Sequence, residues 1–172
     1  MVSTAPYRVL FVCLGNICRS PAAEIVFGAM ADKAGLAGLV EADSAGTIDA
    51  HRGSPPDARM LRALAGCGYT WNGHVSRRIE PGDWDRFDLI VAMDRNNLRD
   101  VRAAALPGTH RARAVAMCDY AVHFSDPEVP DPYWSGDEGF LHVVRLLEDC
   151  CSRLVLELKD RLAPDTRSEP VS

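Results

Sequence analysis

The sequence lacks long apolar runs and an excess of positive charge. No segment approaches the roughly 20 consecutive apolar residues that span a bilayer, and no basic segment leads into an apolar stretch of the kind that marks a signal peptide. The 19 lysines and arginines are outnumbered by 24 aspartates and glutamates, which gives a net charge of −5. Because nucleic-acid binding requires a basic surface, we expect no nucleic acid and no membrane among the partners, and a cytoplasmic location.

Regularly spaced cysteines are also missing. The six cysteines follow no repeated spacing, which argues against a disulfide framework and against a zinc finger. To hold zinc, Cys13 and Cys18 would need a second ligand pair at finger-like spacing, whereas Cys150 and Cys151 are adjacent within an apparent helix. We therefore expect reduced thiols, no metal and no other cofactor.

The hydrophobic pattern predicts an α/β fold. The length suits one domain with one core, which we assign to residues 1–162, and we expect the polar residues 163–172 to form a disordered tail. Uninterrupted apolar runs, such as Val9–Val12 and Leu89–Met93, are typical of buried parallel strands. The other predicted elements are strands over 39–44 and 112–117 and helices over 21–35, 57–67, 97–105 and 138–162. This alternation predicts a central four-stranded parallel sheet with helices on both faces.

A short polar loop separates the first strand from the first helix. Cys13 ends the strand, and Ser20 followed by Pro21 predicts a helix N-cap and the first helical position. The five residues between Cys13 and Arg19 can direct backbone N–H groups at one point, in front of the positive end of the helix dipole. The sequence therefore predicts an anion-binding loop at the carboxyl end of the first strand, which is where ligands of such sheets bind.

The residue types in this loop indicate phosphate chemistry. A thiolate at Cys13 would be stabilised by the loop amides, by the helix end and by Arg19, and would be a nucleophile at neutral pH. The planar guanidinium of Arg19 can hold two oxygens of a phosphoryl group, so no metal is required. The alternatives are a buried structural thiol for Cys13 and an ordinary ion pair for Arg19.

The segment Cys13–Ser20 reads CLGNICRS and closely resembles the low molecular weight protein tyrosine phosphatase family. The resemblance continues through Ser44–Thr47, His74–Arg77, Met93-Asp94 and Asp131–Trp134, and so covers nearly all of the predicted domain. It implies an enzyme that hydrolyses phosphotyrosine and small aryl phosphates through a phosphocysteine intermediate, without a metal. The implied partners are phosphotyrosine-containing proteins and inorganic phosphate, which is both product and inhibitor. We expect a monomer or a weak dimer.

Individual site roles follow from this resemblance. Asp131 lies between two prolines in a long loop and matches the general acid that protonates the departing phenolate oxygen; the alternative is an ordinary loop aspartate. The residues implied to bind phosphate are Leu14, Gly15, Asn16, Ile17, Cys18, Arg19 and Ser20. The residues implied to support the loop by hydrogen bonds are Asn16, Ser20, Ser44 and His74.

A substrate pocket and a redox pair are also implied. The expected pocket residues are Leu14, Ile17, Ala50, His51, Tyr133 and Trp134. Ile17 stands where related arginine phosphatases tend to carry threonine, and a branched aliphatic side chain favours an aromatic substrate. Ala50 stands where many relatives carry an aromatic residue, so we expect a wider mouth, with His51 as either a substitute contact or a solvated loop residue. By the same resemblance, an oxidant would join Cys13 and Cys18 in a reversible disulfide.

Two other functions fit parts of the pattern. An arsenate reductase of the same fold would use the same nucleophile, but it needs a relay of further redox cysteines, and Cys67 and Cys118 form no evident pair. A non-catalytic phosphotyrosine-binding module would be expected to lack the nucleophile or the acid, whereas Cys13 and Asp131 are both present. Catalysis is therefore the favoured interpretation.

Overall fold

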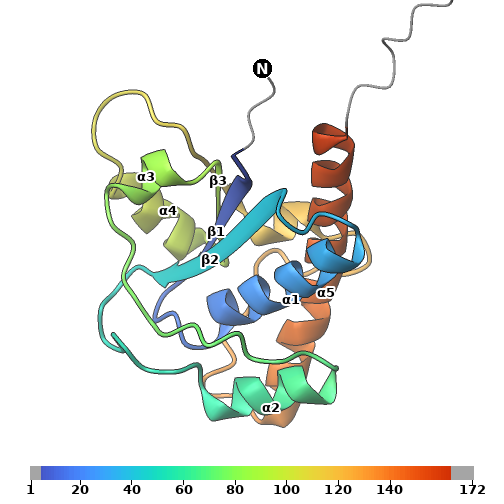
Figure 1. The fold of residues 1–172 in the computed structure, drawn as a ribbon. Coiled ribbons are helices and arrows are strands. Elements are labelled where there is room, and N and C mark those ends of the chain that lie inside the picture. The colour runs from blue at the N-terminus through green and yellow to red at the C-terminus, as the bar shows by residue number, and fades with distance from the viewer. Residues whose placement is uncertain (1–4, 164–172) are drawn as a thin grey trace, which may run out of the picture.

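The computed structural model describes residues 5–163, so all but the first residue of the predicted tail lies outside the described part of the chain. The strands are β1 (Tyr7–Cys13), β2 (Val40–Gly46), β3 (Leu89–Ala92) and β4 (Arg113–Ala116). They form one parallel sheet in the order β2-β1-β3-β4 (Figure 1). The predicted α/β class and four-stranded parallel sheet are confirmed.

Helices cover both faces of this sheet. They are α1 (Arg19–Lys33), α2 (Ala58–Gly66), α3 (Asp83–Arg86), α4 (Arg95–Ala103) and α5 (Asp137–Leu162), with a short 3₁₀ helix η1 (Met117–Tyr120). Along β1, Val9 and Phe11 pack in one core with side chains of α1, α2 and α5. Leu10 and Val12 point to the opposite face and pack with side chains of α3 and α4. Successive strand residues alternate between faces, so one buried strand contributes to two cores.

Two helices begin two residues earlier than the sequence predicted. The expected N-cap at Ser20 is wrong: α1 already begins at Arg19, and its N-cap residue Cys18 makes no side-chain capping bond. Pro21 is tolerated at the third helical position because the first N–H groups of a helix have no intrahelical partner. Helix α4 begins two residues before the expected start because the carboxylate of Asp94 accepts a hydrogen bond from the Asn97 amide and caps it. Helix α3 is a single turn, too short for hydrophobic periodicity to reveal.

The fold brings the carboxyl ends of three strands together beside the loop that follows β1. Cys13 at the end of β1 is paired with Gly46 at the end of β2, and Val12 is paired with Ala92 at the end of β3. Side chains that follow these strands can therefore converge on the same loop. Within residues 5–163, no helix combines the length and apolarity needed to cross a bilayer.

Candidate active site

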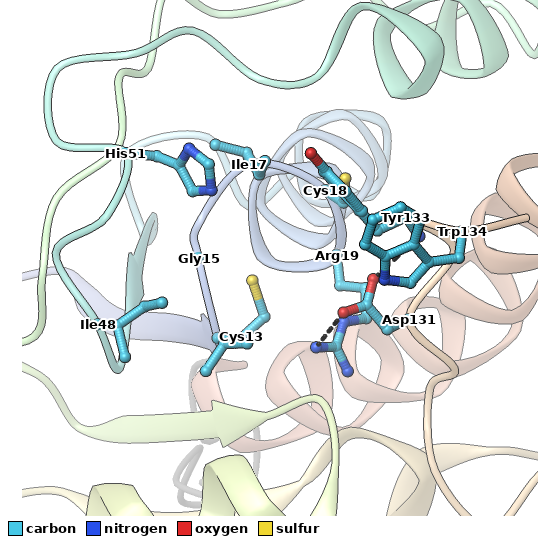
Figure 2. A pocket seen from close by; sticks show the side chains of 11 residues that line it. Cys13, Gly15, Ile17, Cys18, Arg19, Ile48, His51, Asp131, Tyr133 and Trp134 are labelled. Atoms are coloured by element: carbon cyan, nitrogen blue, oxygen red, sulfur yellow. Dashed lines mark hydrogen bonds and ion pairs between the residues drawn. The ribbon is translucent and has the colours of Figure 1, made fainter.

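The loop between β1 and α1 curls its backbone around the Cys13 sulfur. The Asn16 N–H donates to Cys13 Sγ at 3.3 Å. Among the described residues, the N–H groups of Gly15, Ile17 and Cys18 donate to no protein acceptor. Figure 2 shows the sulfur directed into a cavity that this loop borders. Unpaired amides around a sulfur, in front of a helix N-terminus, form a cradle suited to an anion.

A buried hydrogen-bond network holds the loop from behind. Asn16 has a φ of 57°, a left-handed conformation uncommon for residues other than glycine. Its Nδ2 donates to Ser20 Oγ at 2.8 Å and to Ser44 Oγ at 3.0 Å, and its Oδ1 lies 2.8 Å from His74 Nε2. Ser20 Oγ in turn lies 3.0 Å from Cys13 Sγ. The structure thus joins Asn16, Ser20, Ser44 and His74 in one network that ends at the sulfur.

The end of β2 fits closely against the loop. A Cβ atom on Gly46 would lie 2.7 Å from the Leu14 carbonyl oxygen, so only glycine fits there without displacing the loop. Beyond it, the Thr47 N–H donates to the Cys13 carbonyl at 2.9 Å and the Ile48 N–H donates to the Leu14 carbonyl at 3.1 Å. The first half of the loop is therefore fixed to β2 through its own backbone.

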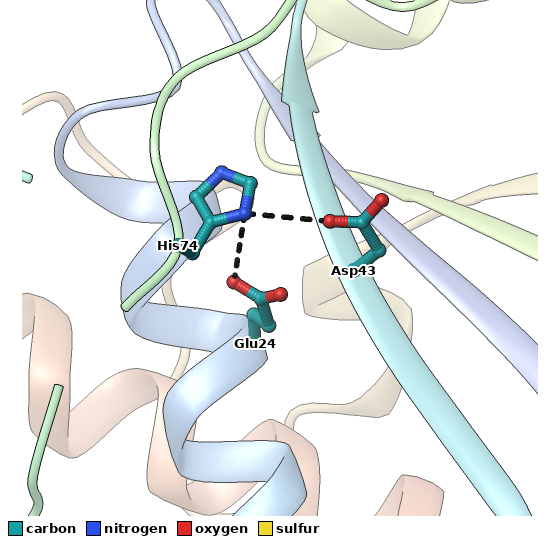
Figure 3. A group of neighbouring side chains, drawn as sticks. All are labelled: Glu24, Asp43 and His74. Carbon is teal, nitrogen blue, oxygen red and sulfur yellow. Dashed lines mark ion pairs between the residues drawn. The ribbon is translucent and has the colours of Figure 1, made fainter. Parts of the chain in front are cut away.

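Two carboxylates face His74 from α1 and β2 (Figure 3). His74 Nδ1 lies 3.6 Å from Glu24 Oε2 and 3.4 Å from Asp43 Oδ1. Burial raises the pKa of Glu24 to about 7, although His74 opposes the shift. Burial acts to raise the pKa of Asp43 as well, but hydrogen bonds from His74 and the charge of Arg77 outweigh it and lower the pKa to about 2.

These three side chains are also the residues that could hold a metal ion. Within the described part of the chain, Glu24, Asp43 and His74 form the one group whose ligand atoms all lie within 4.8 Å of one another. Asp43 already accepts from Arg77 at 3.0 Å, and the other ring nitrogen of His74 contacts Asn16. We interpret the group as the outer part of the network that supports the loop, because each member already has a partner there.

Arg19 is held in place by groups from other elements. Its Nη1 donates to Asp94 Oδ2 at 2.6 Å and to the Val129 carbonyl at 3.2 Å, and its Nη2 lies 3.6 Å from Asp131 Oδ2. Burial acts to lower the pKa of Arg19, but Cys13 and the two aspartates outweigh it and raise the pKa above its ordinary value. The guanidinium therefore stays charged and is oriented beside the sulfur.

Asp131 lies far from Cys13 and Arg19 in sequence, in the loop between η1 and α5. One carboxylate oxygen accepts a hydrogen bond from the Tyr133 N–H at 3.1 Å, and the other faces Arg19. The side chain is 49% exposed, which contrasts with the buried loop residues. Figure 2 shows its carboxyl group beside Arg19 at the edge of the cavity. A carboxyl group there can exchange protons with a bound molecule and with water.

The cavity has a volume of about 200 Å³. Its lining comprises Cys13, Leu14, Gly15, Ile17, Cys18, Arg19, Ile48, His51, Asp131, Tyr133 and Trp134. Ile48 and His51 face Tyr133 and Trp134 across it (Figure 2), and the two aromatic rings meet edge to face with centroids 5.0 Å apart. The opening is thus bordered by apolar side chains on two sides, above a polar floor.

The predictions for two neighbouring residues of the lining, Ala50 and His51, have different outcomes. Ala50 is exposed and does not line the cavity, contrary to the prediction, whereas Ile48 two residues earlier does. His51 packs over Gly15, where an added Cβ would lie 3.0 Å from its Cδ2. Of the two interpretations left open for His51, the structure thus favours a wall residue over a solvated one.

The cysteines differ strongly in their surroundings. Burial, together with the nearby Asp57 and Cys13, raises the pKa of the Cys18 thiol to about 12. Cys13 and Cys18 are both free thiols in this structure, so their redox pairing stays a prediction. The remaining cysteines, Cys67, Cys118, Cys150 and Cys151, do not line the cavity.

Sequence reasoning missed the acidic partner of Arg19. Asp94 comes two residues after the end of the buried strand β3, at the edge of the sheet where Cys13 lies. That position is a signal that could have identified it, because polar residues after adjacent parallel strands gather at one edge. The contributions of Ile48 and Gly46 depend on close contacts that no local pattern reveals.

Comparison with known proteins identifies the family of this chain. A model of the family described as low molecular weight phosphotyrosine protein phosphatase matches residues 8–164. A low molecular weight protein-tyrosine-phosphatase of Streptomyces coelicolor is 41% identical over 158 residues, which cover 91% of this chain and 96% of that protein. A crystal structure of a protein tyrosine phosphatase from Entamoeba histolytica superposes with a TM-score of 0.86 at 37% identity, covering 91% of this chain and 99% of that one. An arginine phosphatase from drosophila superposes with a TM-score of 0.81 at 32% identity, again covering 91% of this chain and 99% of that one. The chain belongs to the low molecular weight phosphotyrosine protein phosphatase family.

Proposed function

We propose that this protein hydrolyses phosphotyrosine in proteins, and small aryl phosphates, through a phosphocysteine intermediate. In the first step, the Cys13 thiolate attacks phosphorus in line with the P–O bond to the phenol. Arg19 and the free loop amides hold the equatorial oxygens as the phosphoryl group flattens. The Asp131 carboxyl group gives its proton to the departing phenolate oxygen.

The second step reverses the proton transfer. Asp131, now a carboxylate, accepts a proton from a water molecule that attacks the phosphocysteine. The S–P bond breaks, Cys13 leaves as a thiolate, and inorganic phosphate is released. Ser20 Oγ, 3.0 Å from the sulfur, can donate a hydrogen bond to this leaving thiolate.

The observation that supports this mechanism most directly is the convergence of three groups on one cavity. Cys13, Arg19 and Asp131 all line it, and the guanidinium lies 3.6 Å from the carboxylate. Asp131 lies in a loop and Cys13 at the end of β1, more than 100 residues apart in sequence, so their shared cavity is a property of the fold. A nucleophile, a guanidinium and a carboxyl group so arranged suit acid-assisted phosphoryl transfer.

The depth of the cavity favours an aromatic ester. The sulfur lies at its floor, below walls formed by Ile48, His51, Tyr133 and Trp134. A tyrosine side chain is long enough to carry its phosphate to the floor, and its ring can pack between these walls. A phosphoserine is shorter, so its peptide backbone would meet the rim first.

Arginine phosphatase activity is the second candidate, since one structural relative bears that name. Against it stands Ile17, which lines the cavity with an aliphatic side chain that offers no hydrogen bond to a guanidinium. Arsenate reduction is disfavoured because Cys67, Cys118, Cys150 and Cys151 lie outside the cavity lining. A purely binding role is disfavoured because both Cys13 and Asp131 reach the cavity.

A comparison of phosphopeptides tests the proposal. The purified protein is assayed with matched peptides that carry phosphotyrosine, phosphoserine or phosphoarginine, with and without a metal chelator. We expect kcat/KM for phosphotyrosine to exceed the other two by at least about 100-fold, the discrimination that a misfitting substrate group can produce. Preference for phosphoarginine, or loss of phosphotyrosine hydrolysis on chelation, would contradict the proposal.

A further inference from the structure

A chain of polar contacts links the phosphate-binding loop to Asp131 by way of helix α2. We propose that Arg59, in the first turn of α2, is a positioning residue that holds the acid loop (residues 121–136, which carry Asp131) in register with the phosphate-binding loop (residues 14–18). The inference rests on the proposed function insofar as Asp131 is taken to be the general acid. Figure 1 shows α2 lying against α5, beside the segment that carries the acid.

The first half of this chain joins Arg59 to the phosphate-binding loop. Asp57, the N-cap residue of α2, donates its backbone N–H to the Ile17 carbonyl at 2.8 Å. Its carboxylate oxygens accept from Arg59 Nε at 3.0 Å and from Arg59 Nη2 at 2.8 Å. This two-point contact fixes the plane of the guanidinium as well as its distance from Asp57. Arg59 therefore takes its orientation from a residue bonded directly to the loop.

The second half joins Arg59 to the acid. The remaining Nη1 donates to the Tyr133 carbonyl at 3.0 Å. The guanidinium carbon also lies 5.2 Å from the centre of the Tyr133 ring and 4.7 Å from that of Phe140, which places it within reach of both aromatic faces. The Tyr133 N–H then donates to the Asp131 carboxylate at 3.1 Å. The Arg59 guanidinium thus contacts Tyr133, whose backbone N–H donates to the Asp131 carboxylate.

Asp131 needs such support more than the other site residues do. Its side chain is 49% exposed, whereas that of Arg19 is 4% exposed, so core packing cannot fix the carboxyl group. The hydrogen bonds with Asp57 raise the pKa of Arg59 and lower that of Asp57, so both partners stay charged. A lysine would keep the charge but could not make the two-point contact and the third hydrogen bond together.

The experiment compares aryl phosphates that differ in their need for an acid. Variants Arg59→Ala and Arg59→Lys are assayed for kcat/KM with p-nitrophenyl phosphate, whose leaving group departs readily, and with phenyl phosphate, whose leaving group needs the proton. We expect kcat/KM for phenyl phosphate to fall roughly 10- to 100-fold, the effect of a small misplacement of a catalytic group, and that for p-nitrophenyl phosphate to change less than about twofold. Inhibition by inorganic phosphate should stay unchanged, because the phosphate-binding loop is intact.

Controls separate positioning from loss of structure. Arg62→Ala changes an exposed arginine of the same helix that has no side-chain hydrogen bond within the described residues, and should leave both substrates unaffected. In an Asp131→Asn background, Arg59→Ala should cause no additional loss, since it acts through the acid. Equal losses on both substrates, a further loss in that background, or an unchanged Arg59→Ala enzyme would each overturn the inference. If Asp131→Asn itself fails to discriminate between the substrates, the proposed acid is wrong and the proposed mechanism falls with it.

Discussion

The two halves of the site are built in opposite ways. The phosphate-binding loop and the start of α1 are largely buried, with Asn16 1% and Ser20 0% exposed, although Leu14 at the mouth is 43% exposed. Hydrogen bonds reach the loop from β2 and from His74. The acid loop is open to solvent, and Trp134 beside it is 93% exposed. In the mechanism proposed above, the phosphoryl group therefore binds in a preformed cradle, whereas the proton donor lies on a solvent-exposed segment.

The acid loop is nonetheless anchored where it begins. Asp149 of α5 accepts hydrogen bonds from the backbone amides of Val122, His123 and Phe124. Burial acts to raise the pKa of Asp149, but these bonds and that from the His123 ring outweigh it and lower the pKa to about 2. The loop is thus fixed where it begins by Asp149, and near Asp131 by the hydrogen bond from Arg59 to the Tyr133 carbonyl.

Replacing the nucleophile should give the largest effect and act on the buried half alone. Cys13→Ser removes the thiolate but leaves the amides and Arg19, so turnover should fall on the order of 10⁶-fold, the scale known for loss of a covalent nucleophile. Phosphate binding, measured by calorimetry, should persist. Turnover of p-nitrophenyl phosphate near the wild-type rate would contradict covalent catalysis by Cys13.

Replacing the acid should give the next largest effect and act on the open half. Asp131→Asn keeps the shape but cannot supply the proton, so kcat/KM for phenyl phosphate should fall about 10²–10⁴-fold. The matched control is Asp137→Asn, which alters an exposed carboxylate in the first turn of α5. An equal loss in both variants would point to a general effect on the loop.

The carboxylate behind the loop should make stability depend on pH. The pKa of Glu24 rises from an ordinary 4.5 to about 7 on folding. Between these values the folded state binds more protons than the unfolded state, so the free energy of unfolding falls as the pH rises, by up to about 3 kcal/mol. Glu24→Gln should flatten this slope in urea unfolding at pH 5 and pH 8. The exposed Glu41→Gln serves as control and should retain the slope.

The smallest expected effect is on the recovery of activity after oxidation of Cys13, in the buried half of the site. Peroxide would convert the Cys13 thiolate to a sulfenic acid, which condenses with the Cys18 thiol to a disulfide and water. Because the pKa of Cys18 is about 12, closure should accelerate about tenfold per pH unit near neutrality as its thiolate fraction grows. Cys18→Ser should recover a smaller share of activity on addition of dithiothreitol. Equal recovery would show that Cys18 gives no protection.

The contrast between the phosphate-binding loop and the acid loop also explains which parts of the site could be predicted from the sequence. Cys13, Arg19 and the strand and helix beside them are contiguous, so local patterns sufficed to predict the anion loop and the parallel sheet. Asp131 could be assigned only through the family resemblance, because nothing local brings it to Cys13. Asp94 and Arg59 act through contacts between segments that are distant in sequence. Whether Ile48 or Ala50 lines the cavity depends on the direction in which the backbone after β2 turns. Such placements arise from tertiary packing, which periodicity does not encode.

The absence of a side chain at Gly46 has a consequence for how this protein can evolve. A single methyl group there would collide with the Leu14 carbonyl at 2.7 Å, and the hydrogen bonds from Thr47 and Ile48 hold this part of the loop against β2. The substitution Gly46→Ala would therefore displace the loop that surrounds the Cys13 sulfur, although residue 46 does not line the cavity. In homologues and in libraries of variants, substitutions should be tolerated at positions near Gly46 far more readily than at Gly46 itself.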